Sequence, residues 1–166
     1  NLQYLLNTLL KTSIVHPQHE FSIEGHPNNT TREHLETLYS LGFRRISYGV
    51  QDMDPDVQRI INRIQPIENV QRATEDARSA GFTSVNFDLI YGLPLQSLHS
   101  IVKTINQVIA LKPDRIAFYS YAHVPWIKPS QRAYSEADLP LGEAKRALYE
   151  LGRDLLEEMG YLEIGM

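Results

Sequence analysis

A carboxylate stands inside what otherwise reads as an apolar strand. Residues 85–91 are rich in β-branched and aromatic side chains and contain Asp88 in their interior. A buried charge costs free energy unless a partner compensates it, which makes Asp88 informative. It could be a structural acceptor for neighbouring backbone amides. Its position near the carboxyl end of a strand instead favours a side chain that faces a ligand.

Polar groups also stand at the ends of the other predicted strands. They are Glu24, the pair Gln51-Asp52 and the pair Ala122-His123. The carboxyl ends of parallel strands share one face of a sheet, and (β/α) barrels place their binding sites there. We therefore predict a pocket with a polar floor and an apolar surround.

Arg63 is predicted to lie on the helix that follows the second strand. From there its guanidinium could reach the pocket rim and hold a carboxylate in a bidentate fork. Taken singly, each of these polar residues also has a structural alternative. The alternatives are an ion pair of Glu24 with Arg44 or Arg45, capping of the helix at Asp54 by Gln51, packing of His123 beside Pro125 and Trp126, and plain solvation of Arg63.

Other chemistry is not indicated by the residues. His16, His19, His26 and His34 have no ligand spacing on a common element and are predicted to lie on the surface. No nucleophile–base pair and no phosphate loop is present. The residues by themselves therefore predict only the binding of a polar ligand.

Helical and extended patterns alternate along the chain and indicate an α/β fold. The predicted strands are residues 20–25, 45–50, 85–91 and 115–121, and the predicted helices are about residues 2–10, 31–41, 55–65, 67–80, 98–111 and 141–159. Strands separated by helices are expected to be parallel with right-handed crossovers, and their apolar runs indicate burial on both faces. A (β/α) barrel segment and an open doubly wound sheet both fit. Since no Gly-x-Gly-x-x-Gly occurs, we favour a parallel-sheet fragment of a partial (β/α) barrel.

Local signals mark several helix ends. Thr30 with Glu33 resembles a capping box, and Asp54-Pro55 places proline at the first position of the next helix. A glycine followed by an aromatic residue ends three helices, at residues 42, 81 and 160. Each is expected to lead into a strand, the last of them near Ile164.

The composition is that of an ordinary globular domain. The chain has 166 residues, of which 42% are hydrophobic, and a net charge of −4. The acidity argues against a nucleic-acid partner, and no apolar run is long enough for a membrane span or a signal peptide, so a cytoplasmic protein is expected. With no cysteine, the chain has no disulfide and no thiolate metal site.

Several stretches, taken in order, closely resemble the oxygen-independent coproporphyrinogen III oxidase (dehydrogenase) family of radical S-adenosylmethionine enzymes. They are residues 21–24, 41–52, 61–65, 81–96, 113–115 and 121–125, so the resemblance spans essentially the whole chain. It implies a partial (β/α) barrel. It also implies oxidative decarboxylation of two propionates of coproporphyrinogen III to vinyl groups, which gives protoporphyrinogen IX in heme biosynthesis.

The resemblance also implies cofactors and site residues. The family uses a 4Fe-4S iron–sulfur cluster and two molecules of S-adenosylmethionine (SAM), whose reductive cleavage gives a 5′-deoxyadenosyl radical. By the family's pattern the SAM-binding positions are Glu24, Gln51, Arg63, Asp88 and Ala122. Glu24 and Arg63 suit the ammonium and carboxylate of SAM. Asp88 and Gln51 suit its ribose hydroxyls, and the backbone of Ala122 could meet adenine.

The family's cysteine triad, spaced C-x-x-x-C-x-x-C, is missing from this sequence. The resemblance therefore implies that residues 1–166 are a single domain, the central part of the barrel of a longer enzyme, without its N-terminal cluster-binding segment and C-terminal domain. We expect this chain alone to be inactive and, because cut strand edges are exposed, to self-associate. Coproporphyrinogen III and an electron donor are the implied partners of the whole enzyme.

Two other readings fit parts of the pattern. One is a heme-binding paralogue with a trafficking role, whose members tend to place Gly-Arg-x-His where this chain has residues 62–65. Those residues and Tyr121-Ala122-His123 look more like the decarboxylase. The other is a (β/α) scaffold without chemistry, whose polar strand ends are merely solvated.

Overall fold

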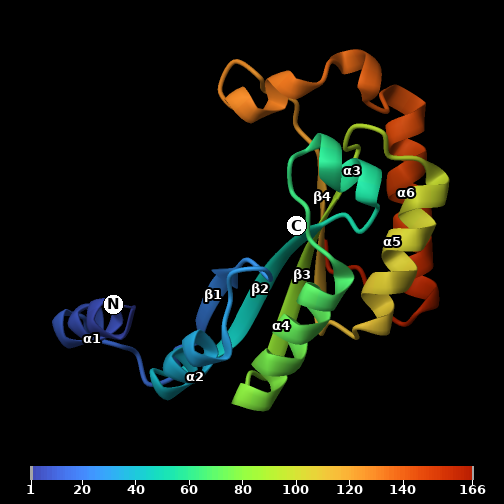
Figure 1. Cartoon of the computed structure of the whole chain (residues 1–166). Helices are drawn as coiled ribbons and strands as arrows, with labels where there is room; N and C mark the ends of the chain where they lie inside the picture. Colours follow the sequence, from blue (N-terminus) through green and yellow to red (C-terminus); the bar gives the residue numbers. More distant parts are fainter. Residues whose placement is uncertain (1, 166) are drawn as a thin grey trace.

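The computed structural model describes residues 2–165 and is built on a four-stranded parallel sheet (Figure 1). The strands are β1 (Phe21–Gly25), β2 (Phe43–Gln51), β3 (Ser84–Tyr91) and β4 (Arg115–Ser120). The helices are α1 (Leu2–Thr12), α2 (Arg32–Ser40), α3 (Pro55–Ile60), α4 (Ile67–Ala80), α5 (Leu98–Ala110) and α6 (Gly142–Glu158), with short 3₁₀ turns at Pro129–Ala133 and Glu136–Asp138. The spatial order β1-β2-β3-β4 follows the sequence, as in a barrel. In a doubly wound sheet the order would reverse at a switch point.

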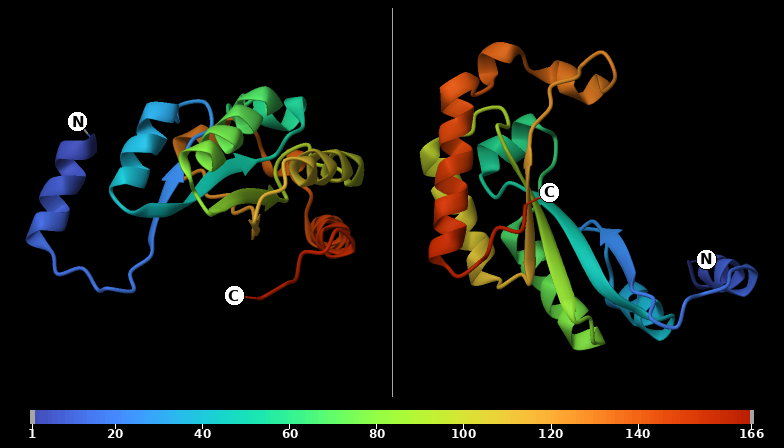
Figure 2. Two further views of the ribbon diagram at one scale, coloured as in Figure 1. Left: turned by 90° about the horizontal axis from the view of Figure 1, so that it is seen from below. Right: turned by 180° about the vertical axis from the view of Figure 1, so that it is seen from behind.

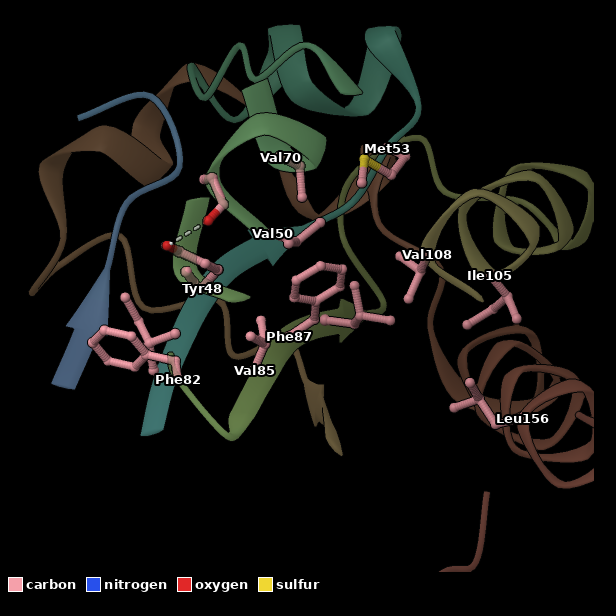
Figure 3. Packing of buried hydrophobic residues seen from close by; sticks show 14 of the residues in the cluster. Tyr48, Val50, Met53, Val70, Phe82, Val85, Phe87, Ile105, Val108 and Leu156 are labelled. Atoms are coloured by element: carbon pink, nitrogen blue, oxygen red, sulfur yellow. Dashed lines mark hydrogen bonds between the residues drawn. The ribbon is translucent and has the colours of Figure 1, made fainter. Parts of the chain in front are cut away.

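Only one face of the sheet is covered by helices. Tyr48 and Val50 of β2 and Phe87 and Leu89 of β3 are buried on that face and pack against α2, α4 and α5 (Figures 2 and 3). The Tyr48 hydroxyl donates a hydrogen bond of 3.0 Å to the Ala73 carbonyl. The prediction of burial on both faces is therefore wrong. Side chains alternate between faces along each strand, and apart from Gly49 and Ile90 the alternate set on β2 and β3 is polar and only partly buried.

Helix α2 begins one residue later than the sequence indicates. The N-cap is Thr31, whose hydroxyl accepts from the His34 amide at 3.3 Å, and His34 rather than Glu33 completes the capping box. The Thr30 hydroxyl instead donates to the His26 carbonyl at 3.0 Å in the turn after β1. The earlier threonine is thus engaged by the preceding turn, which leaves the cap to its neighbour.

Helix α3 is shorter than predicted and does not carry Arg63. It ends at Ile60, because Asn62 adopts a left-handed backbone with φ of 53°. Ile64, which lies within the helix predicted over residues 55–65, is 64% exposed. Arg63 therefore lies on the loop between α3 and α4, and its placement on a helix is corrected.

The predicted glycines end their helices in left-handed geometry, with φ of 96°, 102° and 91° at Gly42, Gly81 and Gly160. The first two lead into β2 and β3 as expected. The third does not lead into a strand, because residues 161–165 form no regular structure and Ile164 is exposed. None of the helices in the described part of the chain is long and apolar enough to cross a lipid bilayer.

Candidate functional site

Four of the five predicted site residues meet on the open face of the sheet, around Gly49 of β2. Gly49 pairs with Asp88 of β3, and Glu24 of β1 pairs with Ser47, two residues earlier in β2. A Cβ placed on Gly49 would lie 2.8 Å from both Arg63 Nη2 and Gln51 Nε2. Glycine at this position is what allows the arginine and the glutamine to lie over the strand.

Asp88 is fixed by two neighbours on the same face. The Ser47 hydroxyl donates to Asp88 Oδ1 at 2.9 Å, and the Asn86 amide donates to the same oxygen at 2.8 Å. Within residues 2–165 no hydrogen bond reaches Oδ2, which leaves that oxygen for a ligand. Asp88 is the fifth residue of the eight in β3, so it lies within the strand rather than at its end.

The electrostatic balance at Asp88 is unfavourable to its charge. Burial raises the pKa of the Asp88 carboxyl, and the nearby Glu24 carboxylate raises it further. Hydrogen bonds from Ser47 and Asn86 and the charge of Arg63 lower this pKa in part. A ligand that donates hydrogen bonds to the carboxylate would relieve the remaining cost.

This balance predicts that Asp88→Asn stabilises the protein at neutral pH. Asparagine keeps an oxygen for Ser47 and Asn86 but carries no charge to desolvate. A raised folded-state pKa means that the ionised form is disfavoured by folding, so the advantage of the variant is present at neutral pH. The advantage should shrink as the pH falls toward 3.8, the ordinary pKa of an aspartate carboxyl, because the wild-type side chain then becomes neutral too.

Denaturant midpoints of wild type and variant, measured across this pH range, check the prediction. Asp154→Asn, at an exposed acid paired with Arg153, is the matched control and should leave the midpoint nearly unchanged. A variant that is less stable than wild type at neutral pH would show that the Asp88 charge is well solvated.

Arg63 uses only part of its guanidinium. Nη2 donates to the Gly49 carbonyl at 2.7 Å, whereas the buried Nε has no partner within residues 2–165. Burial lowers the pKa of Arg63, and the charge of Asp88 raises it in part. An unpaired buried donor of a cation costs free energy, and a ligand carboxylate is the group that would best satisfy it.

Gln51 is held in an uncommon backbone conformation at the end of β2. Its φ is 68°, and the pairing between β2 and β3 shifts register between Gly49 and Gln51. Strained backbone of this kind clusters at functional sites. Gln51 does not cap α3, because Asp54 does so by accepting from the Asp56 and Val57 amides at 2.9 and 3.3 Å.

Glu24 is exposed on the open face and is free of the ion pairs considered for it. Arg45 pairs with Glu20 at 2.6 Å, and the Arg44 guanidinium lies 3.8 Å from the centre of the Tyr39 ring. The structural alternative for Glu24 is therefore wrong. Its carboxylate remains near Asp88, whose pKa it raises.

Ala122 and His123 follow the carboxyl end of β4, which β3 separates from β2 in the sheet. The Ala122 carbonyl accepts from Gln131 Nε2 at 3.1 Å, and Gln131 Oε1 accepts from the Val124 amide at 2.5 Å. The His123 ring packs against Tyr134 at 5.5 Å between centroids rather than beside Trp126, which is 72% exposed. The sheet thus brings four predicted residues together and leaves Ala122 at a distance.

Sequence reasoning missed several members of the site. Ser47, Gly49 and Asn86 share its face through the two-residue alternation of strands, the signal that could have found them. His26 was predicted to lie on the surface, but burial lowers its pKa and the charge of Arg63 lowers it further, so it lies near the site. No group of three or more metal-ligating side chains gathers within residues 2–165, and an iron–sulfur cluster would find no thiolate in this cysteine-free chain.

Comparison with known proteins places this fold and site in context. A family model described as the radical SAM superfamily matches residues 1–108. The chain is 47% identical over 147 residues to the oxygen-independent coproporphyrinogen III oxidase of Helicobacter pylori strain J99. This alignment covers 89% of the chain and 32% of that protein. Over 164 residues the chain is 40% identical to the protein of the same name from Synechocystis, which covers 99% of this chain and 35% of that protein. The chain spans about one third of the length of these relatives.

Solved structures agree with the sequence matches. Coproporphyrinogen III oxidase from Escherichia coli, a radical SAM enzyme, superposes with a TM-score of 0.94 at 39% identity, over 99% of this chain and 38% of that one. The archaeal Elp3 of Methanocaldococcus infernus superposes with a TM-score of 0.68 at 18% identity, covering 79% of this chain and 32% of that one, a likeness of fold alone. The α/β fold predicted from the residue pattern and the resemblance to this enzyme family are both confirmed.

Proposed function

The chain belongs to the radical S-adenosylmethionine superfamily, and on that premise we propose that it forms the SAM-binding part of a longer enzyme that oxidatively decarboxylates coproporphyrinogen III. The whole enzyme would convert two propionates to vinyl groups and yield protoporphyrinogen IX. The observation that carries the proposal is the meeting of Glu24, Gln51, Arg63 and Asp88 around Gly49, with a buried arginine nitrogen left unpaired.

The donors and acceptors of this group suit SAM. Arg63 would pair with the ligand carboxylate through its free Nε, and Glu24 with the ammonium. Asp88 Oδ2 and the Gln51 amide would receive the ribose hydroxyls. The backbone of Ala122 would meet adenine, so the bound ligand would extend from β2 across β3 to the carboxyl end of β4.

The chemistry divides between this chain and the rest of the enzyme. With SAM bound, its one-electron reductive cleavage, with the electron delivered through the cluster of the whole enzyme, would supply a radical able to abstract hydrogen from a propionate side chain. The residues around Gly49 bind and orient the ligand. The thiolates that hold the 4Fe-4S cluster must come from residues outside this cysteine-free chain.

The proposal extends to the whole protein. Residues 1–166 would be the central part of its barrel, with a cluster-binding segment and a further domain elsewhere in the longer polypeptide. The whole enzyme would use two SAM molecules and an electron donor, and would act in the cytoplasm. This chain by itself would be inactive and would self-associate through the open edges of its sheet.

Arg63→Ala in the full-length protein tests the proposal. With the cluster rebuilt without oxygen, and with coproporphyrinogen III, SAM and a reductant supplied, wild type should release carbon dioxide and form vinyl porphyrin. The variant should bind SAM roughly 10- to 100-fold more weakly, because a charge-assisted hydrogen bond contributes about 1.5–3 kcal/mol. Turnover at limiting SAM should fall by at least the same factor.

Arg59→Ala is the matched control, since Arg59 lies on the exposed side of α3 and its one ion pair within residues 2–165 is with the exposed Asp56. It should retain wild-type affinity and turnover. Tight heme binding by wild type without decarboxylation would overturn the proposal in favour of the trafficking paralogue. Unchanged SAM affinity in both Arg63→Ala and Asp88→Asn would favour a scaffold without chemistry.

A further inference from the structure

The loop that carries Arg63 is hydrogen-bonded to the buried side chain of a glutamine of α3. Gln58 is only 6% exposed, and its Nε2 donates to the Gln65 carbonyl at 3.0 Å and to the Asp52 carbonyl at 2.9 Å. Its Oε1 accepts from the Gln65 amide at 2.9 Å. One side chain thus satisfies both backbone groups of Gln65, as a neighbouring β-strand would.

The same residue also holds Arg63 directly through its backbone. The Arg63 amide donates to the Gln58 carbonyl at 2.8 Å, two residues after the left-handed turn at Ile61-Asn62 begins. Gln65, 1% exposed, reaches the Val50 carbonyl with Nε2 at 3.4 Å. The residues before and after Arg63 are therefore tied to α3 and to the end of β2, so its Cα has little freedom.

We propose that Gln58 is a positioning residue that presets Arg63 for its ligand before the ligand arrives. The inference rests on the proposed function, in which Arg63 binds the carboxylate of SAM. The side chain of Arg63 has one protein hydrogen bond, to Gly49, within the described residues and leaves its Nε unpaired. A long side chain held by a single hydrogen bond needs a rigid backbone position if its guanidinium is to meet a ligand carboxylate in the right orientation.

The position of Gln58 argues against a role in general stability alone. A helix of six residues needs no buried polar side chain for its own sake, and an apolar residue of equal size would pack at that depth without desolvating an amide. The side-chain amide of Gln58 is needed because the loop leaves the Gln65 amide and carbonyl without partners in regular structure, and because the Asp52 carbonyl after β2 also needs a donor. The path of the loop brings Arg63 back to the open face of the sheet, where its guanidinium lies over Gly49.

A coupling experiment in the full-length protein separates positioning from stability. Gln58→Met keeps the volume and removes the three side-chain hydrogen bonds. SAM affinity is measured by equilibrium dialysis for wild type, Gln58→Met, Arg63→Ala and the double variant, beside thermal unfolding. We expect Gln58→Met to weaken SAM binding roughly 10- to 100-fold, since a small misplacement of a binding group has effects of this order. It should weaken binding no further when Arg63 is already alanine.

The control is Gln71→Met, at an exposed glutamine of α4 that bonds only to Glu75, and it should leave SAM affinity unchanged. If Gln58→Met lowers the unfolding temperature but not the affinity, or if its effect adds in full to that of Arg63→Ala, the inference is overturned and the proposed function stands. If Arg63→Ala itself has no effect on affinity, the proposed function fails and the inference fails with it.

A measurement on wild type keeps the inference testable even if Gln58→Met does not fold. Amide hydrogen exchange of residues 61–66 is followed with and without SAM. Preset geometry predicts slow exchange at Arg63 and Gln65 before SAM is added, because their acceptors are groups of Gln58. Fast exchange that slows only on SAM addition would mean that the ligand orders the loop, which overturns the inference.

Discussion

Replacing Asp52 by alanine is expected to lower the free energy of unfolding by about 3–5 kcal/mol, since three buried donors would lose their acceptor at about 1–3 kcal/mol each. Asp52 is fully buried, with 0% exposure, at the end of β2. Its Oδ1 accepts from the Asp54 amide at 2.6 Å and the Thr104 hydroxyl at 2.9 Å, and its Oδ2 accepts from Gln96 Nε2 at 2.5 Å. Alanine would leave these donors buried with fewer acceptors, which is the costly outcome for a polar network.

Two effects oppose each other at Asp52, and their sizes decide the result. Burial raises the pKa of its carboxyl, so the charge itself is disfavoured in the folded protein despite its hydrogen bonds. The acceptor oxygens nevertheless join the end of β2 to α5 and to the loop after β3. Asp52→Asn should therefore lower the free energy of unfolding by less than Asp52→Ala does, but by a measurable amount. One asparagine oxygen can still accept, whereas the amide nitrogen would take the place of Oδ2 and meet the Gln96 Nε2 donor.

Denaturant unfolding of the full-length protein with each variant measures these costs. Asp154→Ala, which removes an exposed acid from α6, should change the free energy of unfolding by less than about 1 kcal/mol. An Asp52→Ala loss as small as the control would mean that water replaces the carboxylate and that the network does not join the elements.

Gly49→Ala is expected to weaken SAM binding about 100-fold while leaving the fold nearly as stable as wild type. The new Cβ would lie 2.8 Å from Arg63 Nη2 and Gln51 Nε2, closer than real Cβ atoms lie to any neighbour. Both atoms are the far ends of flexible side chains, so they can move aside at low cost to folding. The groups that move are two of the proposed ligand contacts, which is why affinity should suffer far more than stability.

Gly142→Ala separates the two effects. Gly142 has φ of 52°, so alanine there strains the backbone by about 1–2 kcal/mol, yet its Cβ would meet nothing within 4 Å. This control should lower the unfolding midpoint more than Gly49→Ala and leave SAM affinity unchanged. If Gly49→Ala retains wild-type affinity, the ligand does not approach β2 at this point and the proposed site is misplaced.

The sequence by itself determined the order of the elements and most of their ends. Apolar periodicity, proline at Asp54-Pro55 and the glycines at residues 42 and 81 are local signals, and each produced the element expected from it. Helices between all strands required parallel pairing, since a parallel connection needs a crossover. The polar residues on the strands followed from the same reading.

Tertiary structure alone decided which of those residues act together. The contacts that build the site join residues far apart in the chain, such as Ser47 with Asp88 and Arg63 with Gly49. Asp52 and Asp88 are both acids of the strand regions, yet one is buried beneath the helices and the other faces the open side. The helix or strand propensity of a residue carries no information on such partners. The free energy that selects them comes from burial and from hydrogen bonds that form only when the strands assemble into the sheet.

The same reason explains the errors at the loop and at residues 161–165. The α3–α4 loop leaves the helix because Gln58 offers partners to its backbone: the Gln58 side chain pairs with the amide and carbonyl of Gln65, and the Gln58 carbonyl accepts from the Arg63 amide. An extended pattern near Ile164 has no strand to pair with in the described residues and stays irregular. A sequence pattern predicts a helix or a strand. Whether that element forms depends on whether its backbone amides and carbonyls find hydrogen-bond partners there.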